Sequence, residues 1–139
     1  MTSPRFESVD ELLADARSRL DRLDAPAAAA AVEAGARLVD IRPTWQRRVE
    51  GEIQGAHIID RNHLEWRLDP GSDSRIDAAL PGQRWIVVCS EGYTSSLAAD
   101  ALNSIGVPAT DLIDGFRAWL AAGLPTIDGG SDPDRSPGH

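Results

Sequence analysis

The segment RWIVVCS at residues 84–90, with its continuous apolar run WIVVC, is the feature that most constrains the fold of this chain. Its β-branched centre shows no polar alternation, which is typical of a strand buried on both faces in a parallel sheet. The segment at 94–106, TSSLAADALNSIG, has apolar residues at helical spacing and a glycine that suits the helix end. A strand followed at once by a helix favours a fold in which the two alternate.

The same alternation extends along most of the chain. Further strands are expected at 36–41, 55–59 and 109–113, and further helices at 8–23, 24–35, 61–68 and 115–123. We predict an α/β layered domain with a mainly parallel sheet and helices on both faces. This domain is expected to span residues 26–125, after an N-terminal helical extension at 1–25 and before a flexible polar tail at 126–139.

Charge and cysteine content exclude several classes of protein. The formal net charge of -8 argues against nucleic-acid binding, which requires an excess of Lys and Arg. No apolar run approaches the roughly 20 residues of a membrane span, and the N-terminus lacks the layout of a signal peptide. The location is therefore expected to be cytoplasmic, without membrane contact. A single cysteine excludes an internal disulfide or a CxxC pair. Besides this cysteine, the histidines available as metal ligands are His57, His63 and His139, so no metal and no cofactor is predicted.

That cysteine, Cys89, lies where the central strand ends and shortly before a helix begins. Ligands of parallel α/β sheets bind outside the carboxyl ends of the strands. The helix dipole and the free N–H groups of its first turn favour a thiolate, the reactive form of cysteine. Gly92 lets the loop turn tightly, and the hydroxyls of Ser90, Thr94, Ser95 and Ser96 are candidate donors. The pattern favours a cysteine nucleophile over the alternative of a free cysteine buried in the core.

Two kinds of chemistry use such a loop. A cysteine-dependent phosphatase needs an arginine after five intervening residues, where it grips the phosphoryl oxygens. Ser95 stands at that position, so phosphate or arsenate chemistry is disfavoured. Sulfur transfer through a cysteine persulfide needs only a thiolate and a ring of hydrogen-bond donors.

Four segments, in order, resemble those of a single-domain rhodanese, a sulfurtransferase. LVDIR at 38–42 resembles the first strand of that family, and GEIQGAHII at 51–59 resembles its Gly-His-Ile-Pro-Gly-Ala segment. WIVVCSEGYTSS at 85–96 is similar to its active-site loop, and DLIDGFRAWLAAGLP at 111–125 is similar to its closing signature. The resemblance covers about residues 26–125 and implies a five-stranded α/β sheet with a persulfide on Cys89. It also implies that the short loop from Cys89 to Thr94 selects sulfur.

The sequence departs from the family pattern at several positions. Gln54, Glu52 and Asp114 replace a proline, a histidine and a glycine at turns of the scaffold. In the family, the residue matching Arg42 pairs with a nearby acid, so Glu50 or Glu52 is expected to take that part. The helix at 8–23 lies outside the usual domain and is interpreted as a brace or as an interface for a second copy in a homodimer.

The charge of the loop bears on the substrate. Loops that accept thiosulfate tend to carry Lys or Arg after the cysteine, whereas this loop carries Ser90 and Glu91, which would repel a dianion. Arginines near the strand ends would offset that repulsion. Further candidates for anion binding, for structural pairing or for pocket walls are Asp40, Arg42, Arg61, Arg67, Trp66 and Tyr93.

The sequence thus predicts an enzyme that moves sulfane sulfur through Cys89 to an external acceptor. The donor would be a small sulfur compound or a protein persulfide, and the acceptor a thiol, another nucleophile or a protein, because no second cysteine exists to resolve the persulfide. The alternative is a regulatory or sulfur-binding module that keeps the fold and the cysteine but turns over little.

Overall fold

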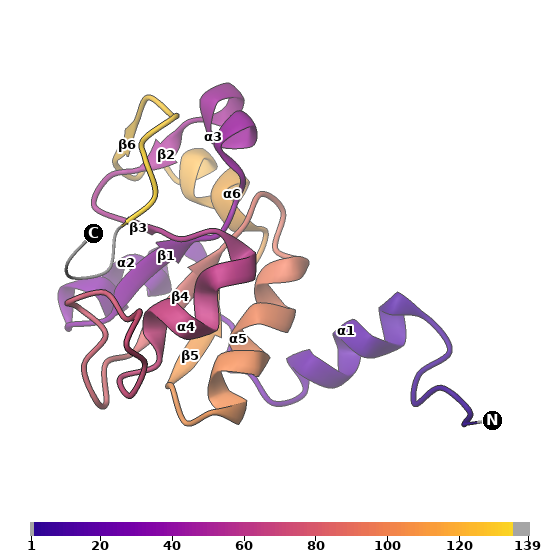
Figure 1. Ribbon diagram of the computed structural model, residues 1–139. Helices are drawn as coiled ribbons and strands as arrows, with labels where there is room; N and C mark the ends of the chain where they lie inside the picture. The colour runs from indigo at the N-terminus through magenta and orange to yellow at the C-terminus, as the bar shows by residue number, and fades with distance from the viewer. Residues whose placement is uncertain (1, 135–139) are drawn as a thin grey trace.

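Four parallel strands form the centre of the molecule (Figure 1). The computed structural model describes residues 2–134. The strands are β1 (Arg37–Asp40), β3 (His57–Ile58), β4 (Trp85–Val88) and β5 (Ala109–Asp111), in the spatial order β3-β1-β4-β5. β4 therefore lies inside the sheet, with β1 on one side and β5 on the other. The expected α/β fold with a parallel sheet is confirmed.

Helices cover both faces of this sheet, as predicted. They are α2 (Ala25–Glu33), α3 (Thr44–Glu50), α4 (Leu64–Leu68), α5 (Thr94–Ser104) and α6 (Gly115–Ala121), with a 3-10 turn, η1 (Arg61–His63), before α4.

Side-chain alternation along β4 divides the core into two layers. Trp85, Val87 and Cys89 belong to the layer that packs against α4 and α5. Ile86 and Val88 belong to the layer that packs against α2 and α6. Both faces of the strand are buried, which explains why its sequence shows no polar alternation. Cys89 continues the first layer and so emerges on the α5 side of the sheet.

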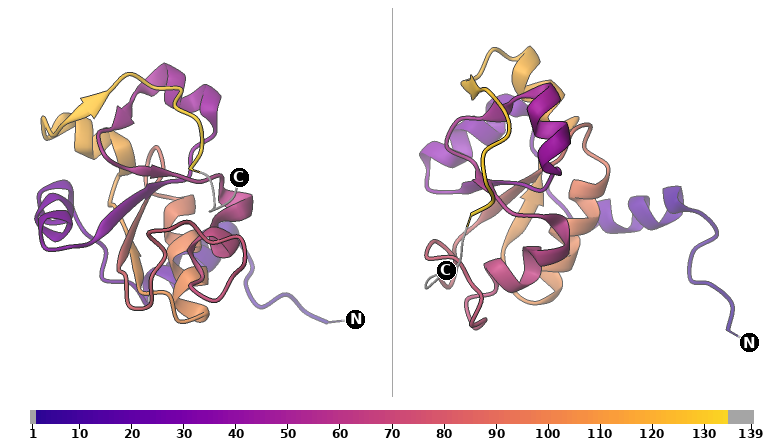
Figure 2. Two further views of the ribbon diagram at one scale, coloured as in Figure 1. Left: turned by 60° about the vertical axis from the view of Figure 1, so that its left-hand side comes forward. Right: turned by 45° about the horizontal axis from the view of Figure 1, so that its top comes forward.

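The N-terminal helix is shorter than predicted. α1 spans Val9–Arg17, and the side chain of Ser8 accepts a hydrogen bond from the N–H of Glu11, as the capping pattern indicated. The helix was expected to continue to residue 23. Instead, Leu23 forms backbone hydrogen bonds with Asp111 and Ile113 at the edge of the sheet, and these bonds hold the chain in an extended form. α1 lies against α5 and projects from the body of the domain (Figure 2).

The resemblance implied five strands, whereas the sheet has four within residues 2–134. Beyond β5, the isolated parallel bridge between Leu23 and Leu112 occupies the edge of the sheet. One bridge is too short for a strand because the chain passes directly into α2, which begins at Ala25.

A small antiparallel pair lies apart from the main sheet. β2 (Glu52–Ile53) pairs with β6 (Thr126–Ile127), so the chain after residue 125 contacts the domain instead of leaving it at once. Farther on, Asp134 accepts hydrogen bonds from the backbone of Ile58 at 3.1 Å and from the ring of His57 at 2.5 Å. The last five residues of the expected tail, 135–139, lie outside the described residues.

Within the described part of the chain, no helix has the length and hydropathy required to cross a bilayer.

Candidate functional site

Cys89 lies at the carboxyl end of β4, in the wall of a small cavity. Its side chain is 5% exposed, and its Sγ accepts a hydrogen bond from the N–H of Gly92 at 3.2 Å. The cavity has a volume of about 250 Å³. Its lining consists of Gln46, Cys89, Ser90, Glu91, Tyr93 and Thr94. Four of the predicted loop residues thus line the cavity at Cys89, together with Gln46 from α3, whereas Gly92 donates to the sulfur and Ser95 is not part of the lining.

The tight turn of the loop depends on Gly92. Its φ of +87° lies in the left-handed region that favours glycine. A Cβ at this position would lie 2.8 Å from the backbone nitrogen of Asp114 and 3.1 Å from the guanidinium of Arg22. Any side chain would therefore push the loop away from the β5–α6 connection and move the N–H that donates to Sγ.

The other side of the loop is held by the N-terminus of α6. The N–H of Phe116 donates to the carbonyl of Cys89 at 2.8 Å, and the N–H of Arg117 donates to the carbonyl of Ser90 at 3.3 Å. A Cβ on Gly115 would overlap both of these carbonyl groups. Helix α6 thus satisfies two of its free N–H groups with the loop that carries the cysteine.

The hydroxyls of three serines, which the sequence indicated as candidate donors around the cysteine, bind other groups instead. Ser90 Oγ donates to the carboxylate of Glu50 at 2.9 Å. Ser95 Oγ and Ser96 Oγ donate to Asp111 Oδ2 at 2.7 and 2.8 Å, inside the domain. The buried carboxylate of Asp111 accepts these hydroxyls together with the guanidinium of Arg22, because a buried charge needs several hydrogen-bond donors. The donor to the thiol that the structure shows is therefore the backbone N–H of Gly92, and not a serine hydroxyl.

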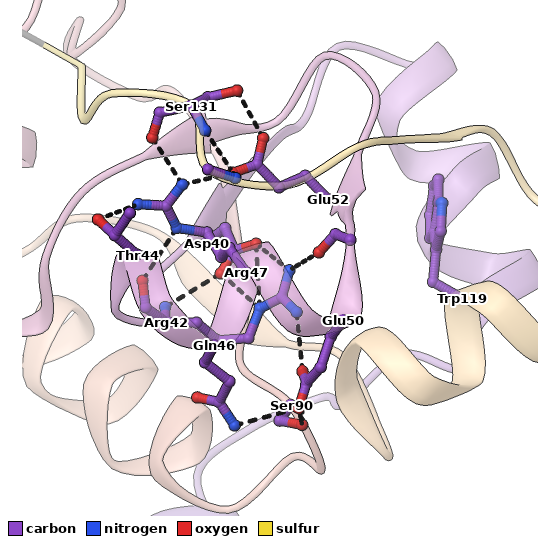
Figure 3. A network of polar contacts seen from close by, with 12 residues as sticks. Asp40, Arg42, Thr44, Gln46, Arg47, Glu50, Glu52, Ser90, Trp119 and Ser131 are labelled. Carbon is purple, nitrogen blue, oxygen red and sulfur yellow. Dashed lines mark hydrogen bonds and ion pairs between the residues drawn. The ribbon is translucent and has the colours of Figure 1, made fainter.

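A buried arginine supports the loop from the β1 side (Figure 3). Arg42 donates to Asp40 at 2.6 Å and to Glu50 at 2.9 Å, and it stacks on the ring of Phe116 with its guanidinium carbon 4.4 Å from the ring centroid. Of the two acids expected as partners of Arg42, Glu50 and Glu52, Glu50 thus forms the pair. Because Glu50 also accepts from Ser90, the ion pair is connected to the residue next to Cys89.

Burial and pairing act in opposite directions on these charges. Burial favours the neutral form of Glu50, but the hydrogen bonds from Arg42 and Ser90 outweigh it and hold the pKa of Glu50 below its usual value. Burial likewise opposes the charge on Arg42, yet Asp40 and Glu50 hold the pKa of Arg42 above its usual value. Glu50 and Arg42 are therefore both charged at neutral pH.

A second buried ion pair lies beside the first (Figure 3). Arg47 pairs with Glu52, and the carboxylate of Glu52 also accepts from the N–H groups of Gly130 and Ser131, each at 3.1 Å, and from Ser131 Oγ at 2.6 Å. Arg47 donates in turn to the carbonyl of Ser131 at 2.7 Å. The residue that replaces the family's histidine thus binds the C-terminal segment.

Glu91 forms an ion pair with Arg117 of α6 at 2.9 Å, and both side chains are exposed. The pair places a positive charge beside the carboxylate that was expected to repel an anionic donor. Sequence reasoning did not consider Arg117, since the two residues are far apart in the chain and nothing local connects them.

The remaining candidates lie away from the lining of this cavity. Arg61 pairs with Glu65 at 2.8 Å and contributes to a separate hollow beside Ile41 and Thr44. Arg67 donates to the carbonyl of Ser74 at 3.2 Å. Trp66 is 62% exposed. These side chains do not line the cavity at Cys89.

A thiol at the end of a central parallel strand, held by a short loop that leads into a helix, defines a class of α/β domain with a candidate cysteine nucleophile. Comparison with known families matches residues 10–122 to the rhodanese-like domain. The chain belongs to this family. No curated protein sequence matches it.

Solved structures agree with this assignment. A protein of unknown function from Rhodopseudomonas palustris, described as a possible tyrosine phosphatase, is 28% identical, with a TM-score of 0.78 over 91% of this chain and 98% of that one. A thiosulfate sulfurtransferase from Pseudomonas aeruginosa is 27% identical, with a TM-score of 0.63 over 81% of this chain but only 20% of that one. A rhodanese-related protein from Thermoplasma volcanium, 18% identical with a TM-score of 0.62, covers 76% of this chain and 96% of that one and shares the fold.

Proposed function

We propose that this protein is a sulfurtransferase that carries sulfane sulfur as a persulfide on Cys89. In the first step the Cys89 thiolate attacks the outer sulfur of a donor such as thiosulfate. The S–S bond forms, the donor's own sulfur–sulfur bond breaks, and sulfite leaves with the electron pair. In the second step an acceptor thiolate attacks the terminal sulfur, which restores the Cys89 thiolate and releases the acceptor persulfide.

The observation that carries this proposal is the composition of the loop around Sγ. Gly92 N–H donates to the sulfur, and the N–H groups of Ser90, Glu91 and Tyr93 donate to no protein acceptor among the described residues. Neutral donors at a helix N-terminus stabilise an anion without fixing its geometry. A terminal persulfide sulfur is a single anionic atom, which suits such donors.

The acceptor must come from outside the chain because Cys89 is its only cysteine. The cavity is accessible to large acceptors, since Tyr93 in its lining is 61% exposed. A small thiol or a cysteine on a partner protein are both included in the proposal. A reactive thiol that must stay reduced suits a reducing compartment, so we also propose a cytoplasmic location.

Phosphoryl transfer, which the description of the Rhodopseudomonas palustris relative raises, receives less support. No arginine is part of the lining of the Cys89 cavity. Ser95, at the position where a phosphatase carries its arginine, donates into the core to Asp111. A phosphoryl group would thus lack the bidentate cation that grips its oxygens.

The test is intact-mass analysis of the protein after incubation with thiosulfate, mercaptopyruvate and a protein persulfide. We expect a gain of one sulfur atom on the wild type and none on Cys89→Ser, with loss of that sulfur when a thiol is added. If no donor adds sulfur to Cys89, the sulfurtransferase proposal is wrong.

The competing proposal is a sulfur-binding or regulatory module with little turnover. It would give a stable persulfide that added thiols remove slowly, over hours. Release within seconds to minutes under single-turnover conditions would exclude it.

A further inference from the structure

Two arginines from the N-terminal segment bind the same carbonyl in the Cys89 loop. Arg17, the last residue of α1, donates to the carbonyl of Gly92 at 2.7 Å. Arg22, in the connection to α2, donates to the same oxygen at 3.0 Å. Arg17 and Arg22 precede Gly92 by 75 and 70 residues in the sequence, so these hydrogen bonds are tertiary contacts and not a local cap.

Arg22 is itself fixed by a buried acid. It donates to both carboxylate oxygens of Asp111, at 2.9 and 3.2 Å, and Asp111 is fully buried at the end of β5. The same carboxylate accepts the hydroxyls of Ser95 and Ser96, in the first turn of α5. Arg17 adds a bond to Ser96 Oγ at 3.1 Å. The N-terminal segment, β5 and the start of α5 thus form one rigid support beneath the loop.

The position of the clamped carbonyl gives the support a chemical consequence. Gly92 provides the N–H that donates to Cys89 Sγ, and its own carbonyl is the oxygen that the two arginines hold. That oxygen belongs to the peptide whose N–H is contributed by Tyr93, a residue in the lining of the cavity. Two cations on a peptide oxygen draw electron density toward it and strengthen the N–H of that peptide as a donor.

We infer that Arg17 and Arg22 are positioning residues for Cys89. They fix the Gly92–Tyr93 peptide so that the Gly92 N–H stays on Sγ, and they polarise the Tyr93 N–H that meets the transferred sulfur. These two arginines of the N-terminal segment are thereby part of the unit that performs the reaction. This inference rests on the proposed function in that Cys89 is taken as the reacting residue.

Arg17 is the better residue to test. Removal of Arg22 would leave the buried carboxylate of Asp111 without its cation, and the variant would lose stability for that reason alone. Arg17→Met keeps the aliphatic stem and removes the donors, while Arg17→Lys keeps a cation that can still reach an oxygen. Arg19→Met is the matched control: Arg19 ties the same segment to α5 through Asp100 at 2.8 Å but contacts no atom of the loop.

Three quantities are measured on each variant: the rate of Cys89 alkylation by iodoacetamide, the rate and KM of persulfide formation from thiosulfate, and the midpoint of thermal unfolding. We expect Arg17→Met to slow both reactions roughly tenfold, the size of one hydrogen bond from a charged donor (about 1.4 kcal/mol). The loss should appear in kcat with little change in KM, because the donors act on charge that develops during transfer. Arg17→Lys should recover part of the rate.

The control separates positioning from mere attachment of the segment. Arg19→Met is expected to react at the wild-type rate even where its unfolding midpoint falls as much as that of Arg17→Met. Equal rates for Arg17→Met and Arg19→Met would overturn the inference. Because alkylation needs no sulfur donor, it tests the clamp even if the wild type forms no persulfide, so the two proposals can fail separately.

Discussion

The substitution Gly129→Ala is expected to detach the C-terminal segment from α3. A Cβ at this position would overlap the backbone carbonyl of Arg47 in α3. Backbone in a helix cannot move aside as a flexible side chain can, so the segment itself must leave. With it go the three hydrogen bonds that Gly130 and Ser131 donate to the carboxylate of Glu52.

The magnitude follows from two opposing quantities. Three hydrogen bonds to an ionised carboxylate contribute roughly 4–9 kcal/mol to the free energy of unfolding. Release of residues 129–131 returns about 3–6 kcal/mol of backbone conformational entropy. The difference leaves a loss of about 2 kcal/mol for Gly129→Ala. In a domain of this size, that corresponds to a fall of roughly 6–8 °C in Tm.

Urea unfolding followed by tryptophan fluorescence measures this loss. Gly71→Ala is the matched control, because Gly71 is exposed, lacks a positive φ, and its nearest contact to an added Cβ is an ordinary 3.5 Å. If the two variants unfold within about 0.5 kcal/mol of each other, the segment does not stabilise the domain and the reasoning is refuted.

Three further results are expected. Burial works against the charge of Glu52, but Ser131 and Arg47 outweigh it and hold the pKa of Glu52 below its usual value. The contribution of ionised Glu52 to the free energy of unfolding is therefore present above about pH 4.3, and it is lost as the pH falls through the lower pKa of the folded state. Urea unfolding between pH 5 and 3 should therefore show a flatter pH dependence for Gly129→Ala than for the wild type. Asp114→Gly should raise the unfolding free energy by about 0.5–1 kcal/mol, because Asp114 has a left-handed φ of 59°; no gain would mean that the turn carries no strain. Arg117→Gln should lower kcat/KM for thiosulfate about two- to fivefold at low salt, with the effect disappearing in high salt; a salt-independent change would exclude a role for the charge of Glu91.

The sequence was informative wherever local pattern and burial coincide. The unbroken apolar run before Cys89 predicted a central strand with both faces buried, and β4 has that place because its alternating side chains enter two separate cores. The resemblance to the family, in which the residue matching Arg42 pairs with a nearby acid, narrowed the partner of Arg42 to Glu50 or Glu52. Of the two, Glu50 makes the pair.

The support of the loop could not be predicted in the same way. Arg17 and Arg22 resemble ordinary surface arginines of an amphipathic segment, and their partner is a backbone carbonyl, which has no sequence signature. Asp111 was included in a strand without a role, although its burial at the strand end redirects the hydroxyls of Ser95 and Ser96. The contacts of the segment after residue 127 are tertiary, made by backbone N–H groups and by the side chains of Ser131 and Asp134 with distant residues, so composition alone indicated a tail.

The pairing of Arg22 with Asp111 also sets an order of events during synthesis. The two residues are 89 positions apart, so Arg22 leaves the ribosome long before Asp111 is made. The thiol at position 89 emerges earlier than Asp111 as well, which means that a nascent chain carries its cysteine for a time without the support that holds Gly92. Long-range closure of this kind comes late in folding, after β4 and β5 have paired. The newborn protein is therefore expected to acquire a structured thiol site only as its last third is completed.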